Sequence, residues 1–145
     1  MRVFLDTTYL LPVVGIDVNL PNDLLEKLFS KLFSSDHSFV INQLSLFELF
    51  GKASRYFSID EKAKDRFNTG MKSILSSQID IEPVFTLDTL SMVLEINEKI
   101  KDLPDCPITA TALIYSDVML TETADIPKAV EFEVLNLKTF ADKYL

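Results

Sequence analysis

The sequence predicts an α/β fold, a three-layer sandwich in which helices cover both faces of a central parallel sheet of four to five strands. Short apolar stretches alternate with longer stretches of helical periodicity along the whole chain, which is the pattern of repeated strand–helix units. The crossovers between such strands are expected to be right-handed. No internal repeat, low-complexity stretch or long linker interrupts the alternation, so we expect one domain over residues 1–145.

The first half of the chain contains two expected strands, each followed by helical sequence. Val3–Leu5 is short and apolar, and capping side chains after it lead into a short helix from Tyr9 to Val14. The stretch from Pro21 to Leu32 places leucines and a phenylalanine at helical spacing. Phe39–Ile41 is the second apolar strand, and an apolar stripe indicates the next helix from Ser45 to Ala53.

The second half of the chain contains three further expected strands, separated by helices. In chain order, the expected elements are a helix over about 60–76, a strand over 79–85, a helix over 86–101, a helix from about 105, strands over 118–121 and 134–137, and a helix over 138–145. In a parallel sheet of this kind, ligands bind beyond the carboxyl ends of the strands. Acidic residues at strand ends therefore become candidates for a functional site.

Composition excludes several classes of protein and of metal site. With His37 and Cys106 as the only histidine and cysteine, the chain has neither an internal disulfide nor the ligands of a structural zinc site. A metal ion here must be a hard cation held by oxygen atoms, such as Mg²⁺ or Mn²⁺. No apolar run is long enough for a membrane span, the start of the chain does not resemble a signal peptide, and a single thiol fits a reducing compartment, so we expect a cytoplasmic protein.

Charge is unevenly distributed along the chain. The net charge of −8 argues against a general nucleic-acid-coating protein. The segment from Lys52 to Lys72 is different, because its lysines and arginines outnumber its acids. This segment is interpreted either as a solvated helical face or as a local binding surface for phosphates, with Lys52 and Arg55 as the candidate RNA contacts.

Three acidic residues lie at or near strand ends, and each has a structural and a functional interpretation. Asp6 follows the first strand and is either a helix cap or a metal ligand. Glu48 lies in an apolar helical stretch, where an acid is costly to bury unless it is paired; its alternative role is a capping box with Ser45. Asp105 begins a helix between two prolines, so it also has a capping interpretation.

A fourth acid is expected from the loop after the strand at 118–121. Asp125 and Glu122 are the candidates, although a loop acid is often only solvated. Carboxylates gathered at one sheet edge raise one another's pKa unless a cation neutralises them. A divalent cation bound there would assist attack of water on a phosphodiester.

These motifs, taken in order, resemble the PIN-domain nucleases, including the VapC-type toxins of toxin–antitoxin pairs. The opening strand ending in Asp6-Thr7-Thr8 is similar to the first family motif, and Glu48 within an apolar helix is similar to the second. The best match is the segment Asp105-Cys106-Pro107-Ile108-Thr109-Ala110-Thr111-Ala112-Leu113, and the stretches 118–121 and 134–137 resemble the family's later strands. The resemblance covers nearly the whole chain and implies a PIN-like sandwich.

The resemblance also implies residue roles. By it, Asp6, Glu48 and Asp105 match the metal-binding, catalytic acids, with Asp125 favoured over Glu122 as the fourth. The family often has an acid or an asparagine where this chain has Thr123, which puts full activity in question. Thr8 and Thr121 are candidates to orient a carboxylate or a bound water, or else make only local turn contacts.

The expected function is cleavage of RNA phosphodiester bonds by a Mg²⁺- or Mn²⁺-dependent endoribonuclease, which the resemblance extends to the toxin of a toxin–antitoxin pair. It implies RNA, an antitoxin protein and a second copy of the chain as partners. The alternative is a catalytically weakened or inactive PIN-fold module that binds RNA or docks a partner. A phosphatase with Asp6 as nucleophile ranks below both, because Thr8 stands where that chemistry needs a second acid.

Overall fold

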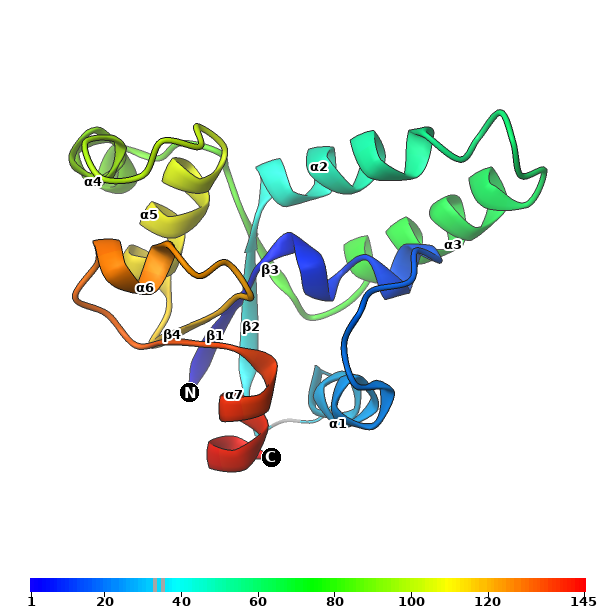
Figure 1. Cartoon of the computed structure of the whole chain (residues 1–145), viewed down its shortest axis with the longest axis horizontal. Helices are drawn as coiled ribbons and strands as arrows, with labels where there is room; N and C mark the ends of the chain where they lie inside the picture. Colours follow the sequence, from blue (N-terminus) through cyan, green and yellow to red (C-terminus); the bar gives the residue numbers. More distant parts are fainter. Residues whose placement is uncertain (33, 35) are drawn as a thin grey trace.

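A five-stranded parallel sheet forms the centre of the computed structural model, which describes residues 1–32, 34 and 36–145. The strands are β1 (Arg2–Leu5), β2 (Ser38–Asn42), β3 (Asp80–Glu82), β4 (Val118–Leu120) and β5 (Val134–Leu135). Their order across the sheet is β3-β2-β1-β4-β5, and every described pair is parallel. The expected class and strand number are therefore confirmed, and β1 lies in the middle of the sheet (Figure 1).

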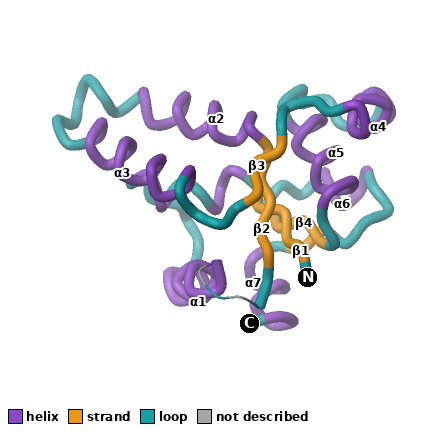
Figure 2. Tube along the Cα trace, turned by 180° about the vertical axis from the view of Figure 1, so that it is seen from behind, coloured by secondary structure: helices purple, strands orange, loops and turns teal. Residues whose placement is uncertain are grey.

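Helices connect the strands throughout. The structure contains α1 (Asn22–Leu32), α2 (Gln43–Ser54), α3 (Ala63–Leu75), α4 (Leu87–Asn97), α5 (Asp105–Tyr115), α6 (Ile126–Ala129) and α7 (Leu137–Tyr144). None of the described helices is long and apolar enough to cross a membrane. Figure 2 shows α4, α5 and α6 on one side of the sheet and α2 and α3 extending from the other side.

Both faces of the sheet are buried, and the central strand contributes to both cores. Val3 and Leu5 belong to the core that includes α1, α3 and α7, whereas Phe4 belongs to the core beneath α4 and α5. All three side chains are fully buried. A strand buried on both faces can place polar side chains only at its ends, so the two cores direct functional groups to the sheet edge.

The structure corrects several expected boundaries. In place of one helix from Tyr9 to Val14, two short 3₁₀ helices form at Thr7–Tyr9 and Pro12–Val14, because Pro12 begins a second turn and Gly15 ends it at a φ of 84°. The helix expected over 86–101 ends at Asn97, so residues 98–104 form a turn and loop. The strands over 79–85 and 134–137 are shorter than expected, and α6 was not predicted.

Gly70 allows α3 to pack directly on the backbone of the second 3₁₀ helix. A Cβ atom at Gly70 would lie 2.2 Å from the carbonyl oxygen of Val13, which is far inside van der Waals contact. Gly51, on α2, has no heavy atom within 4 Å of the same position. A side chain larger than glycine is therefore excluded at Gly70 and allowed at Gly51.

Replacing Gly70 with alanine is expected to lower the free energy of unfolding by about 1–3 kcal/mol, because the added methyl group overpacks the contact with Val13. Gly51→Ala is the matched control and should raise it by about 0.5–1 kcal/mol, because alanine has the higher helix propensity. Urea unfolding followed by circular dichroism measures both. Equal stability of the two variants would contradict the close approach of α3.

Candidate functional site

Asp6 is a buried carboxylate at the carboxyl end of the central strand. Its side chain is 8% exposed. One oxygen, Oδ1, accepts a hydrogen bond from the backbone N–H of Thr7 at 2.7 Å, and Oδ2 accepts one from the hydroxyl of Thr121 at 2.6 Å. Asp6 therefore caps the first 3₁₀ helix and also contacts the end of β4. The predicted contact between Thr121 and a site carboxylate is present.

Glu48 is joined to the same region through Thr7. The Thr7 hydroxyl donates to Glu48 Oε1 at 2.8 Å, so one residue binds two of the candidate acids. Thr8, which the sequence analysis selected for such a role, is half-exposed, and no described residue forms a hydrogen bond with its hydroxyl. The capping box with Ser45 is wrong, because α2 begins earlier and Asn42 is its N-cap.

Asn42 fixes the position of α2 relative to α5. This fully buried side chain accepts a hydrogen bond from the N–H of Leu44 at 2.7 Å and donates one to the hydroxyl of Thr111 at 2.8 Å. Thr111 in turn donates to the carbonyl oxygen of Pro107 at 2.8 Å. Because Glu48 lies on α2 and α5 begins at Asp105, these bonds set the relative position of two candidate acids.

The candidate acids influence one another electrostatically. Burial raises the pKa of Asp6, and the hydrogen bonds from Thr121 and Thr7 oppose that rise. Burial likewise raises the pKa of Glu48, with a further increase from the charge of Asp6. For Asp105, burial first and then the charges of Asp102, Asp6 and Glu48 raise the pKa to about 6. The three predicted acids therefore lie within electrostatic reach of one another.

The side chains as they stand do not form a closed ligand set. Among the residues that the structure describes, no group of three or more His, Cys, Asp or Glu side chains converges closely enough to hold a metal ion. Like charges repel, and threonine hydroxyls bind Asp6 and Glu48, which accounts for the spacing. Each carboxylate oxygen retains a second lone pair, so the chemistry of the donors suits a hard cation.

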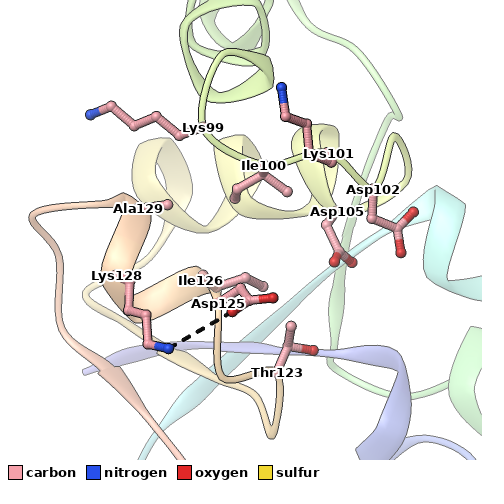
Figure 3. Close-up of a pocket in the computed structure, with 10 residues that line it drawn as sticks. All are labelled: Lys99, Ile100, Lys101, Asp102, Asp105, Thr123, Asp125, Ile126, Lys128 and Ala129. Carbon is pink, nitrogen blue, oxygen red and sulfur yellow. Dashed lines mark ion pairs between the residues drawn. The ribbon is translucent and has the colours of Figure 1, made fainter.

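A cleft of about 490 Å³ opens beside Asp105. Asp102, Asp125 and Thr123 also line it, and Figure 3 shows the carboxylates of Asp105 and Asp125 directed into the same space. Asp125 is the favoured fourth acid of the sequence analysis; its side chain is 89% exposed and lies 4.0 Å from the ammonium of Lys128. Asp102 was not predicted as a site residue. The residues before it were expected to form a helix up to about residue 101, whereas they form a turn and loop.

Glu122 has a structural role in this arrangement. Its Oε1 accepts hydrogen bonds from the hydroxyl of Tyr9 at 2.5 Å and from the N–H of Leu137 at 2.9 Å. It therefore links the first 3₁₀ helix to the start of α7, and it does not line the cleft. Burial and the neighbouring Glu122 raise the pKa of Tyr9, so the phenol remains a donor.

Of the two candidate RNA contacts, Lys52 lies on α2 and Arg55 is the C-cap of that helix, both beyond Glu48 in the sequence. The charge of Lys52 lowers the pKa of both Asp6 and Glu48, which places this lysine within electrostatic reach of the buried acids. Arg55 follows at the end of α2 and is exposed. Farther along the basic segment, Arg66 pairs with Asp60, so part of the segment's positive charge is neutralised within the chain.

Comparison with known proteins connects this chain to others through structure alone. No protein-family model matches the sequence, and no curated protein matches it. Three solved structures resemble this chain, and each structural alignment covers nearly the whole of both chains.

One is VapBC2 from Rickettsia felis bound to a promoter DNA fragment, with a TM-score of 0.71 and 15% identity over 94% of this chain and 98% of the matched chain. Another is FitAcB from Neisseria gonorrhoeae, with a TM-score of 0.67 and 18% identity over 94% and 98%. A third is VapBC-1 from nontypeable Haemophilus influenzae, with a TM-score of 0.62 and 14% identity over 95% and 99%. At these identities the likeness establishes the fold, and the expected PIN-like fold is confirmed.

Replacing Asp105 with asparagine should stabilise the metal-free protein at neutral pH. The folded-state pKa of about 6 lies above the ordinary value of 3.8, so the ionised form is disfavoured in the folded state. We expect the free energy of unfolding to rise by about 1 kcal/mol at pH 7.5, after allowing for solvent screening of this half-exposed group. This gain should shrink as the pH falls from 6 towards 4, because the carboxyl group of the parent protein becomes protonated.

Urea unfolding in EDTA at pH 7.5, 6 and about 4.5 measures the difference. Glu131→Gln, an exposed loop substitution outside the site, controls for loss of one negative charge. A gain of equal size at all three pH values would contradict the interpretation.

Replacing Thr121 with valine should lower the free energy of unfolding by about 1–3 kcal/mol, because it leaves Asp6 Oδ2 buried without its donor. Thr109→Val is the matched control: its hydroxyl is buried and has no hydrogen-bond partner among the described residues, so the same change should be neutral or stabilising. Calorimetric melting temperatures compare the two. Similar decreases in melting temperature in both variants would argue against a specific role for the hydrogen bond between Thr121 and Asp6.

Proposed function

We propose that this protein is a metal-dependent ribonuclease that acts at the carboxylates gathered around the end of β1. The observation that carries the proposal is that Thr7 binds both Asp6 and Glu48 at the end of β1, with Asp105 near enough for the charges of those two acids to raise its pKa. Keeping several carboxylates near one another without a cation costs free energy, so such an arrangement is typical of a functional site. The order of the motifs along the sequence supports the same assignment.

The donor set suits Mg²⁺ or Mn²⁺. Asp6, Glu48 and Asp105 would hold the ion, with Asp125, which lines the cleft together with Asp105, as the fourth acid. When bound, the cation would lower the barrier to attack of water on a phosphodiester. The threonines act on the acids: Thr7 orients Asp6 and Glu48, and Thr121 orients Asp6. Lys52 and Arg55 would attract the phosphates of the RNA.

The structural comparisons favour a toxin–antitoxin setting. The similar chains come from VapBC and FitAB toxin–antitoxin complexes, two of them solved with DNA. By this likeness the chain would act as the toxin, would be inhibited by an antitoxin protein, and would form a homodimer. Cleavage would take place in the cytoplasm, where RNA is available.

A second candidate function is a binding module without turnover. One observation favours it: no three acids of the described residues converge on a common point. Thr123, which lines the cleft where the resembled family often has an acid, agrees with this alternative. Metal binding separates the two functions, because a decayed site would lose its cation affinity.

The test combines cleavage with metal binding. Asp6→Asn and Asp105→Asn are each expected to reduce Mg²⁺-dependent cleavage of a mixed RNA panel at least about 100-fold and to weaken Mn²⁺ binding about tenfold or more, because each removes a charged ligand. Titration calorimetry measures the second quantity independently of activity. Asp142→Asn on α7 controls for charge and should behave like the parent protein.

Two results would contradict the proposal. Parent protein that binds no Mn²⁺ at millimolar concentrations would favour the binding module. Cleavage that survives in EDTA, or in both Asp variants, would indicate a contaminating nuclease.

A further inference from the structure

Asp102 adds an acid to the cleft that no sequence motif indicated. It belongs to the loop between α4 and α5, three residues before Asp105, and both side chains line the cleft. Figure 3 shows the carboxylates of Asp102 and Asp105 beside each other. Among the charges of the described residues that raise the pKa of Asp105, that of Asp102 comes first, ahead of Asp6 and Glu48. Asp102 is therefore the acid with the strongest electrostatic effect on Asp105.

A buried side chain holds the backbone of this loop against the start of α5. The thiol of Cys106, which is 2% exposed, lies 3.5 Å from the carbonyl oxygens of Ile100 and Asp102 and can donate its proton to either. The side-chain amide of Asn97, at the end of α4, donates to the Cys106 sulfur at 3.7 Å. The position of the Asp102 backbone relative to α5 is thereby set by contacts inside the protein.

The carboxylate of Asp102 has no partner within the described part of the chain. There, Asp102 accepts a hydrogen bond only through its backbone carbonyl oxygen, and it forms no ion pair with a described lysine or arginine. Figure 3 shows the ammonium group of the neighbouring Lys101 directed away from this carboxylate. The lone pairs of both Asp102 carboxylate oxygens are therefore available to a cation.

Asp125 is less well placed to bind the same cation as Asp105. Its side chain is 89% exposed, and its Oδ1 lies 4.0 Å from the ammonium of Lys128. It is absent from the charges of the described residues that raise the pKa of Asp105. Thr123 lines the same cleft and has no charge. The negative charge beside Asp105 in the cleft therefore comes from the loop before α5, and the loop after β4 adds less to it.

We propose that Asp102 binds the divalent cation together with Asp105 and contributes more to its affinity than Asp125 does. The inference rests on the proposed function, because it takes Asp6, Glu48 and Asp105 as the other acids of the site. Mg²⁺ and Mn²⁺ are bound through oxygen ligands, and a carboxylate beside Asp105 supplies a further charged one. One charged ligand then comes from a loop that the sequence motifs did not include.

Mn²⁺ binding to the metal-free protein tests this assignment by titration calorimetry. We expect Asp102→Asn to weaken the affinity about tenfold or more, and Asp125→Asn about threefold or less, at both about 100 mM and about 500 mM KCl, because salt screens distant charges much more than a direct ligand contact. Glu98→Gln is the matched control. It removes a charge from an exposed position at the start of the same loop, outside the cleft, and should bind Mn²⁺ like the parent protein.

Paramagnetic broadening of amide NMR signals locates the ion independently of its affinity. When the parent protein is titrated with a small fraction of an equivalent of Mn²⁺, the signals of Asp102 and Asp105 should lose intensity before that of Asp125. Circular dichroism confirms that each variant is folded, so a loss of affinity cannot come from unfolding.

The results separate this inference from the proposed function. Unchanged affinity in Asp102→Asn, a loss that disappears at the higher salt concentration, an equal loss in Asp125→Asn, or broadening that begins at Asp125 would overturn the inference, even if the protein cleaves RNA. Mn²⁺ binding that requires Asp102, without metal-dependent cleavage, would support the inference and contradict the ribonuclease. Parent protein that binds no Mn²⁺ would overturn both.

Discussion

The hydrogen bond from the Thr121 hydroxyl to Asp6 Oδ2 joins the end of the central strand β1 to the end of its neighbour β4, and the position of Asp6 depends on it. Asp6 follows a strand that is buried on both faces, so its carboxylate has almost no access to water. A charge in such a position requires polar partners from the protein, and Thr7 and Thr121 provide them. Thr7 then extends the same network to Glu48 on α2. The first acid is thereby linked to the second.

Much of the fold could be predicted from the sequence because local patterns encode it. Val3–Leu5 and Phe39–Ile41 are apolar runs too short for helices, and both are central strands in the structure. Asp105 was placed at the start of a helix by the flanking prolines, and α5 begins there. The expectation that Asp6, Glu48 and Asp105 lie near one another came from a topological rule, since the carboxyl ends of parallel strands share one edge, and Thr7 joins the first two of them in the structure. Each of these predictions needed only neighbouring residues and a general principle.

The remaining features depend on contacts between distant residues. Asn42 and Thr111 are 69 positions apart, and no local sequence pattern predicts the hydrogen bond between their side chains. Glu122 could have been a ligand by sequence, but its partners Tyr9 and Leu137 come from two other elements. Asp102 was missed because the helical pattern of α4 continues through a segment that instead turns. Hydrogen bonds between side chains from separate elements determine the roles of these residues, and the hydrophobic periodicity of the sequence does not reveal such bonds.

The contact between Gly70 and Val13 has a consequence for how this protein can evolve. Because α3 rests on backbone atoms, its spacing from the sheet does not depend on the side chains at its outward positions. Those positions include Lys64 and Lys72 of the basic segment. Substitutions there can alter the charge of the surface while the helix stays in place. The charge of this surface can therefore drift by single steps, without a compensating change in the core.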